Sequence, residues 1–252
     1  MLSKNINFQN FKKIKKVKKV NKIFENLLKD QPSFFETLKP TYKYSYSKRA
    51  LSKYKKFLNI RIIGMGGSVL GSEAIHDFLK KKIKKKLTFV NNLNNNDDYL
   101  QDKNINLNLI ISKSGNTLET VANSNTLIKK KDSNIVITEN KESYLTNLAS
   151  QLKAEIFEHK NYVGGRYSVL SEVGMLPAEL MNLNENKFKQ FNNLIKNKIF
   201  VNNLINNVMA TLNFINNGKF ASVILNYDEQ SESLFKWYQQ LIAESLGKKS
   251  KG

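Results

Sequence analysis

The chain has 252 residues, of which 40% are apolar, and this suffices for a sizeable core in one large or two small domains. It contains no cysteine and only two histidines. Disulfides, thiolate nucleophiles and cysteine-bearing zinc sites are therefore excluded, and a histidine-rich metal centre is disfavoured. No apolar run reaches the roughly 18 residues that a membrane-spanning helix needs. The composition fits a reducing cytoplasm, which is the location that we expect.

The formal net charge of +20 raises the question of nucleic-acid binding. Lysine outnumbers arginine 38 to 3, and asparagine occurs 35 times. Proteins that read bases and phosphates rely on arginine, because its planar guanidinium binds bidentately. A chain rich in lysine and asparagine but poor in arginine is better explained by AT-rich coding bias, so we do not favour a nucleic-acid partner.

The first 57 residues are basic and contain a helical pattern. Apolar residues recur there at three- and four-residue spacing, on one face of an amphipathic helix: Phe11, Ile14, Val17, Val20, Ile23, Phe24, Leu27 and Leu28. Lysines occupy the other face. We predict a packed helix with its lysines in solvent, and the alternatives are a membrane-surface helix or a targeting segment.

From about residue 58 short β-branched runs alternate with helical segments. The runs are at 60–64, 87–90, 107–111, 135–138 and 155–157, and helices are expected near 70–82, 117–129 and 142–151. This alternation is typical of βαβ units and predicts an α/β domain with a parallel sheet. Helical patterns then fill 172–217, and a further strand at 222–226 and a helix near 230–245 follow.

The strand expected at 60–64 runs into a glycine-rich turn that contains Gly66, Gly67 and Ser68. Glycines there let backbone N–H groups approach an anion, and the start of a helix favours negative charge. The turn lacks the Gly-Lys-Ser/Thr of a P-loop and the third glycine of a dinucleotide fingerprint. It indicates either an anion site or only a tight connection between strand and helix.

Three hydroxyl groups and a lysine follow the strand expected at 107–111: Ser112, Lys113, Ser114 and Thr117. They lie at the carboxyl end of a parallel strand, the edge at which open α/β sheets bind their ligands. Hydroxyl and backbone N–H groups at the start of a helix suit a phosphate monoester. We therefore predict phosphate binding, and the alternative is a helix that these residues merely cap.

Two further segments carry chemically useful side chains. Arg166 follows two glycines and is one of three arginines, so it is either a fixed cation for a developing oxyanion or a salt-bridged residue of a surface turn. Gln240 and Glu244 share one face of the last predicted helix. Glu244 is either a base that moves a proton between adjacent sugar carbons or a solvated surface charge.

Together, and in this order, the four segments resemble the glucose-6-phosphate isomerase family over about residues 58–252. The shared features are the Gly-Gly-Ser turn, the Ser-Lys-Ser-Gly-Asn-Thr-x-Glu-Thr loop, the Val-Gly-Gly-Arg-Tyr-Ser run and the Gln-x-x-x-Glu-Ser-x-Gly-Lys run. The first two also occur in most sugar-isomerase (SIS) domains, and the last two are more specific.

The fold that the resemblance implies is α/β, with an SIS-type three-layer αβα domain and a parallel sheet at 58–180. An N-terminal helical segment at 1–57 precedes this domain. A helical connector at 181–218 and the truncated start of a second SIS-like domain at 219–252 follow it.

The function that the resemblance implies is interconversion of glucose 6-phosphate and fructose 6-phosphate through a cis-enediol, in glycolysis and gluconeogenesis, without a metal or an organic cofactor. Glu244 would be the base, and Arg166 would stabilise the enediolate. The substrate would be bound by Gly67, Ser68, Ser112, Lys113 (through its backbone), Ser114, Thr117 and Gln240. A homodimer of the full-length protein is implied as well, without a membrane or nucleic-acid partner.

Two features depart from the family pattern. The family's ring-opening histidine and C-terminal lysine have no counterpart in these residues, since neither His76 nor His159 lies at the family position. Glu172 stands where the family usually has a small residue, and we expect it to add only a surface charge. We interpret the sequence as the N-terminal part of a longer isomerase. The alternative is a short SIS-type protein that binds a phosphosugar without isomerising it.

Overall fold

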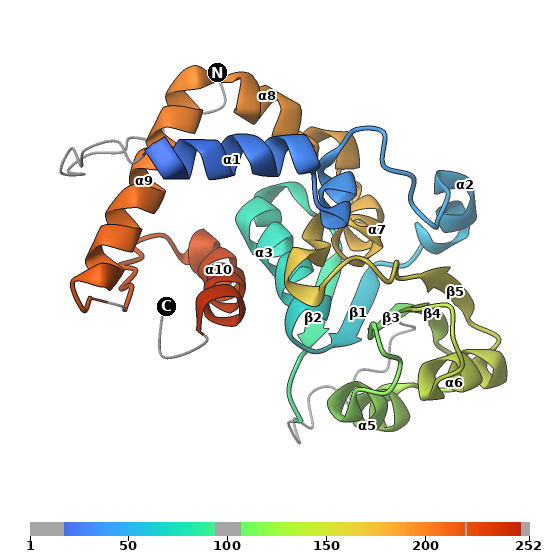
Figure 1. The fold of residues 1–252 in the computed structure, drawn as a ribbon. Coiled ribbons are helices and arrows are strands. Elements are labelled where there is room, and N and C mark those ends of the chain that lie inside the picture. The colour runs from blue at the N-terminus through green and yellow to red at the C-terminus, as the bar shows by residue number, and fades with distance from the viewer. Residues whose placement is uncertain (1–17, 94–106, 220, 248–252) are drawn as a thin grey trace. The chain divides into compact units, whose positions relative to one another are not determined.

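The computed structural model describes residues 18–93, 107–219 and 221–247 (Figure 1). Contacts divide the chain into two compact units. The sheet unit comprises Lys43–Glu185 and Leu225–Leu241, and the helical unit comprises Met1–Tyr42, Asn186–Ile224 and Ile242–Gly252. Helix α10 (Glu232–Leu246) has residues in both units. The domain boundaries inferred from the sequence stay predictions.

Five parallel strands form the sheet, in the order β2-β1-β3-β4-β5. They are β1 (Asn59–Gly64), β2 (Lys86–Val90), β3 (Leu107–Ile111), β4 (Ser133–Thr138) and β5 (Glu155–Glu158). Because β2 and β3 lie on opposite sides of β1, the chain reverses its direction of winding there. Ligands of open α/β sheets bind at such a switch point, outside the carboxyl ends of the strands. Gly64 pairs with Ile111, so the loops that follow β1 and β3 begin next to each other.

Helices connect these strands in the predicted alternation. They are α3 (Leu70–Leu79), α5 (Leu118–Leu127) and α6 (Tyr144–Leu152), with the helical turns η3 (Gly66–Ser68) and η4 (Lys80–Lys82) on either side of α3. Before β1 lie α2 (Lys48–Leu51) and η2 (Ser52–Tyr54), and after β5 lie η5 (Gly165–Leu170), α7 (Glu172–Leu180) and η6 (Glu185–Phe188). The strands predicted between 60 and 157, and the three helices between them, are confirmed.

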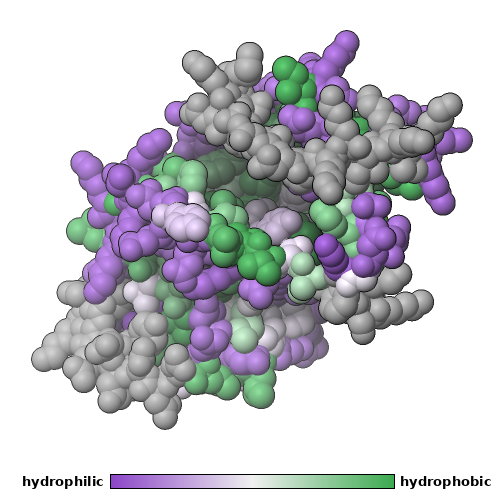
Figure 2. Space-filling model, turned by 90° about the vertical axis from the view of Figure 1, so that its left-hand side faces the viewer, coloured by the Kyte–Doolittle hydropathy of each residue, from purple (hydrophilic) through white to green (hydrophobic). Residues whose placement is uncertain are grey.

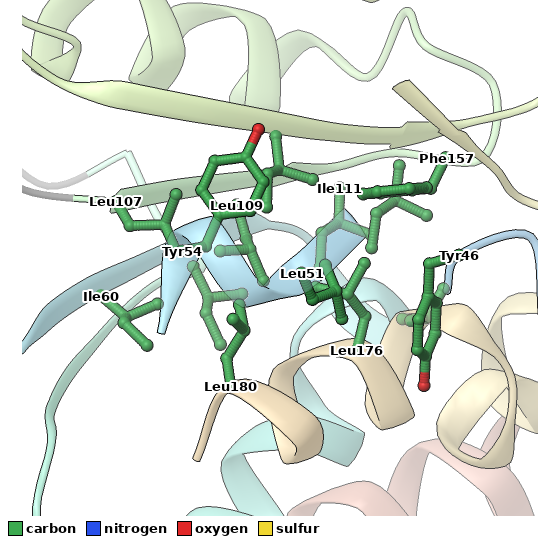
Figure 3. Close-up of a cluster of buried hydrophobic side chains, with 14 of the residues drawn as sticks. Tyr46, Leu51, Tyr54, Ile60, Leu107, Leu109, Ile111, Phe157, Leu176 and Leu180 are labelled. Carbon is green, nitrogen blue, oxygen red and sulfur yellow. The ribbon is translucent and has the colours of Figure 1, made fainter. Parts of the chain in front are cut away.

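The central strands β1, β3 and β4 are buried on both faces, which is why they are largely apolar runs, whereas the edge strand β5 leaves Ile156 exposed. Figure 3 shows one face, where Leu109 and Ile111 of β3 lie across from Leu176 and Leu180 of α7. The opposite face packs against α5 and α6 through Ile63, Val90, Ile110, Leu127, Val136, Leu145 and Ala149. Adjacent residues of a strand, such as Ile110 and Ile111, therefore enter different cores. This is the three-layer αβα arrangement expected from the sequence.

A buried polar ladder crosses three strands of the sheet. Arg61, Asn108 and Asn134 occupy matching positions on β1, β3 and β4. Arg61 Nη1 donates to Asn108 Oδ1 (3.2 Å), and Asn108 Nδ2 donates to Asn134 Oδ1 (2.9 Å) and to Asp132 Oδ2 (3.1 Å). All four side chains are buried. Since a buried charge is costly without partners, the ladder favours this one register of the strands.

The helical unit contains α1 (Lys18–Asp30), η1 (Ser33–Leu38), α8 (Phe191–Lys196) and α9 (Lys198–Asn216). Helix α1 confirms the C-terminal part of the predicted amphipathic helix, whereas Phe11, Ile14 and Val17 lie outside the described residues. Phe24 and Leu28 are half-buried, and Ile23 and Leu27 are exposed, so only a narrow stripe of α1 is covered. Helix α1 packs against α9.

One predicted strand is wrong. Residues 221–228, which include the predicted strand at 222–226, are in neither helix nor strand, and Tyr227 is 94% exposed. A strand needs a neighbour to complete its backbone hydrogen bonds, and the sheet that the structure describes does not include this segment. The helix predicted near 230–245 is formed as α10, after the turn η7 (Glu229–Ser231).

The surface drawn in Figure 2 has hydrophobic residues in patches among hydrophilic ones. Large apolar side chains are exposed in the helical unit, among them Phe214 and Val223. Leu225, the first residue of the sheet unit's second segment, is exposed as well. Of the helices that the structure describes, none combines the length and the apolar character needed to cross a membrane.

Candidate active site

The glycine-rich turn after β1 is held by close packing of backbone on backbone. Gly66 has a φ of +52°, a conformation that favours glycine. A Cβ atom on Gly67 would lie 2.3 Å from the carbonyl oxygen of Gly165, so only glycine fits there. Ser168 Oγ donates to the carbonyl oxygens of Gly67 (3.1 Å) and Gly165 (2.7 Å). The structure thus brings together the first and third segments that the sequence singles out. Ser68 ends the turn and is half-buried.

Arg166 follows directly after the glycine that packs on this turn. Its side chain is half-buried, and its Cζ lies 4.8 Å from the ring centre of Tyr167. Stacking on the ring limits the positions that the guanidinium can take. Val163 and Ser168 on either side are buried. Arg166 therefore belongs to an anchored segment next to the glycine turn, which suits a fixed cation.

Three hydroxyl groups converge in the loop between β3 and α5. Ser112 Oγ lies 2.8 Å from Thr117 Oγ1 and 3.4 Å from Ser114 Oγ, and Ser114 Oγ lies 3.5 Å from Thr117 Oγ1. Ser112 Oγ also accepts from the backbone N–H of Gly115 (3.2 Å), whose φ is +71°. Ser112 is buried and Ser114 is exposed, so the cluster is accessible from the side of Ser114.

Thr117 occupies the N-cap position of α5, but its side chain forms no capping hydrogen bond. Its hydroxyl faces the two serines instead. Helix α6 shows the contrast within the same chain, since Ser143 caps it by accepting from the backbone N–H of Thr146. The first N–H groups of a helix suit an anion when no side chain caps them. The hydroxyl cluster therefore differs from the simple helix cap that was the alternative interpretation.

Lys113 ties this loop to the segment that leads to Arg166. Its Nζ donates to the carbonyl oxygen of Asn161 (2.6 Å) and lies 3.7 Å from Glu139 Oε1. A hydrogen bond from Lys141 lowers the pKa of Glu139, and the charge of Lys113 lowers it further. The side chain of Lys113 is thus engaged between two loops, and its carbonyl oxygen accepts from the backbone N–H of Glu139 (3.1 Å), so the predicted substrate contact falls to its backbone N–H.

His159 adjoins the same loop and is buried. Its backbone N–H donates to the carbonyl oxygen of Thr138 (2.7 Å). Its side-chain Nδ1 lies 3.2 Å from the carbonyl oxygen of Lys160. Burial lowers the pKa of His159 from 6.5, and Lys113 nearby lowers it too, although the contact with Lys160 opposes the shift. The ring of His76 packs near Phe89, and the two ring centres are 5.4 Å apart.

Gln240 of α10 lies against the glycine turn. A Cβ atom on Gly66 would come within 2.8 Å of Gln240 Nε2. Within the sheet unit, the segment that carries Gln240 thus contacts the glycine-rich turn after β1. Glu244 lies four residues further along α10, in the part that belongs to the helical unit, and it is exposed. Its place relative to Arg166 stays a prediction.

Glu172 is not the surface charge that the sequence predicts, because it is fully buried. Its Oε1 accepts from the backbone N–H of Ser45 (2.9 Å), which lies 127 residues away in the sequence. Glu179 and Glu185 are buried in the same unit, and Lys48 Nζ lies 2.8 Å from Glu185 Oε1. The N-terminal part of the sheet unit supplies these partners, and no local pattern around Glu172 reveals them.

Comparison with known sequences identifies the family. The family model described as phosphoglucose isomerase matches residues 21–251. Glucose-6-phosphate isomerase of Methanocaldococcus jannaschii is 35% identical over 221 residues, which cover 80% of this chain and 54% of that protein. Glucose-6-phosphate isomerase of Onion yellows phytoplasma is 32% identical over 216 residues, which cover 76% and 50%. The chain spans about half the length of the curated relatives that it matches.

Solved structures share the fold. A hypothetical protein of Thermus thermophilus matches with a TM-score of 0.71 and 22% identity, over 91% of this chain and 60% of that chain. Tagatose-6-phosphate ketose/aldose isomerase of Escherichia coli matches with a TM-score of 0.56 and 17% identity, over 96% and 68%. These likenesses show the SIS-type α/β fold. Since the family model matches nearly the whole chain, the chain belongs to the phosphoglucose isomerase family.

Proposed function

We propose that this chain carries phosphate-binding and catalytic residues of an enzyme that interconverts glucose 6-phosphate and fructose 6-phosphate through a cis-enediol, in glycolysis and gluconeogenesis. Family membership and relatives named for this activity support the proposal. The observation that carries it is the hydroxyl cluster of Ser112, Ser114 and Thr117, which replaces an ordinary helix cap at the switch point of the sheet.

The hydroxyl cluster is the proposed site of the phosphate group. Ser112, Ser114 and Thr117 lie close enough together for their hydroxyls to reach different oxygens of one phosphate. The backbone N–H of Lys113 adds to them, and Gly67 and Ser68 contact the sugar. Binding at the phosphate fixes one end of the substrate, so that C1 and C2 meet the acid and base groups in one orientation.

Glu244 is the proposed base. Starting from the open-chain aldose, it takes the proton from C2 and returns it to C1, while a second proton moves from O2 to O1. The enediolate that forms between these steps carries negative charge on oxygen, and Arg166 stabilises it. Gln240 contacts the substrate from the same helix as Glu244. The route requires a base, an acid and charge stabilisation, and the proton transfers balance without an oxidant or a reductant.

Glu244→Gln in the full-length protein tests this assignment. The amide keeps the shape of the side chain but does not accept the proton, so turnover of fructose 6-phosphate should fall by roughly 10²–10⁴-fold. Binding of the sugar phosphate should stay within about twofold, since uniform binding is separate from the proton transfer. Turnover is measured by a coupled assay and binding by calorimetry. Glu25→Gln, on the exposed side of α1, is the control and should change neither.

The same measurements separate the alternatives. Unchanged turnover in Glu244→Gln contradicts the role of that residue. Saturable sugar-phosphate binding without any turnover in the unaltered full-length protein would favour the non-catalytic phosphosugar-binding protein. The proposal extends to a homodimer in the cytoplasm, on the strength of the family, and the mass in solution from light scattering tests the dimer.

A further inference from the structure

Helix α10 is attached to α3 and its preceding turn at two points, both within the sheet unit. At its first turn, Ser233 Oγ donates to Asp77 Oδ2 (2.5 Å), and Ser233 is buried. Seven residues later, about two helical turns, Gln240 lies against Gly66. Asp77 lies near the end of α3, and Gly66 lies just before its start. The two contacts therefore place α10 along α3 in the opposite direction.

Asp77 is itself held in place. His76 Nδ1 lies 2.7 Å from Asp77 Oδ1, so each carboxylate oxygen has a partner of its own. Serine is a modest helix former, and in α10 its hydroxyl meets the neighbouring helix instead of solvent. The turn η7, which directly precedes α10, also contacts α3. The start of α10 is thus anchored more specifically than apolar packing alone would require.

We propose that Asp77 and Ser233 are positioning residues of the isomerase, whose hydrogen bond sets the register of α10 on α3. This register determines where Gln240 meets the glycine turn, and helical continuity carries the effect to Glu244. This positioning role rests on the function proposed above for Gln240 and Glu244. Because a displacement of about 1 Å can cost a large part of a catalytic rate, loss of the hydrogen bond should affect turnover more than binding.

The only tryptophan of the sequence provides a direct readout. Trp237 lies on α10 between the two contacts and is half-buried. In Ser233→Ala we expect tryptophan emission at longer wavelength and stronger quenching by acrylamide. We expect kcat for fructose 6-phosphate to fall roughly tenfold, with KM within about twofold. Ser233→Thr keeps the hydroxyl and should restore both the tryptophan emission and kcat.

Ser231→Ala is the matched control. Ser231 Oγ donates to Asp228 Oδ2 (2.6 Å) in the exposed turn before α10, so its loss should move neither tryptophan emission nor kcat. Asp77→Asn is a milder second variant, because the amide keeps the shape and one acceptor oxygen. It should give an intermediate loss of kcat, and it decides the question if Ser233→Ala does not fold.

The outcomes distinguish the two proposals. An unaltered protein that neither binds nor turns over the sugar phosphate overturns the proposed function. An active unaltered protein whose Ser233→Ala and Asp77→Asn variants keep the full kcat overturns the positioning role. Equal loss of kcat in Ser233→Ala and Ser231→Ala also overturns it, because the effect would then not depend on the contact with Asp77.

Discussion

The two loops at the carboxyl edge of the sheet are built by different means. The turn after β1 is held by shape, because the backbone of Gly67 lies against that of Gly165 without space for a side chain. The loop after β3 is held by hydrogen bonds among Ser112, Ser114 and Thr117. Close packing does not accept an added atom, whereas a hydrogen-bond network loses strength one bond at a time. The hydroxyl groups can also exchange their mutual bonds for bonds to a phosphate without a change of backbone.

Gly67→Ala breaks the first loop and should have the largest effect of the substitutions in these two loops. Its Cβ would lie 2.3 Å from Gly165 O and 3.0 Å from Arg166 N, and both are backbone atoms. Since one of the two segments must move, we expect a loss of about 1–3 kcal/mol in the free energy of unfolding, and loss of sugar-phosphate binding. Urea unfolding and calorimetry measure these effects.

Gly165→Ala is the control for this substitution, because a Cβ there meets no atom within 4 Å. It should change the free energy of unfolding by less than about 0.5 kcal/mol. Equal stability of the two variants would mean that shape does not hold the turn.

Ser112→Ala weakens the second loop and should have a smaller effect on stability. The backbone N–H of Gly115 loses one of two acceptors and keeps the carbonyl oxygen of Ser112 (3.2 Å), while Thr117 loses its nearest hydroxyl partner. We expect about 1 kcal/mol of destabilisation, together with roughly tenfold weaker sugar-phosphate binding from the loss of one phosphate contact. Thr126→Ala, which removes an exposed hydroxyl bonded within α5, should be nearly neutral. The contrast between the loops would fail if Ser112→Ala destabilised as much as Gly67→Ala.

Replacing His159, which adjoins the loop after β3, should have the smallest effect, and this effect is seen in how stability changes with pH. Burial lowers its pKa below 6.5, so the folded protein binds this proton less readily than the unfolded chain does. The stability that it contributes is present above about pH 6.5 and is lost as the pH falls toward the lowered pKa. Thermal midpoints of His159→Gln should therefore decline less between pH 7 and 5 than those of the unaltered protein. Parallel pH curves would rule out a contribution from this histidine.

Much of the fold follows from local sequence patterns. The strands are predictable because β-branched runs bounded by glycine, lysine and asparagine leave few other choices. The hydroxyl loop is predictable because Ser112, Ser114 and Thr117 follow directly from a recognisable strand end. The order of the strands, and with it the switch point, is known only from the structure. The contacts of Gly67 with Gly165 and of Gln240 with Gly66 are not predictable in this way, because each joins residues far apart in the chain.

The errors have the same origin. Residues 222–226 have the composition of a strand, but a strand forms only where a neighbour completes its hydrogen bonds. Glu172 is charged and follows a loop, yet the segment around Ser45 covers it and supplies its partner. In both cases tertiary surroundings outweigh local preference. The role of Glu244 stays a prediction for a related reason, since it depends on residues outside its own helix.

The polar ladder within the sheet also constrains how this sequence can diverge. Replacing Arg61 alone would remove the guanidinium that lies 3.9 Å from the buried carboxylate of Asp132 and donates to the amide oxygen of Asn108. Such a single change should cost several kcal/mol, whereas joint replacement of the whole set by apolar residues should be nearly neutral. We therefore expect four positions to change together in evolution: Arg61, Asn108, Asp132 and Asn134. Replacement of one of them alone should be rare.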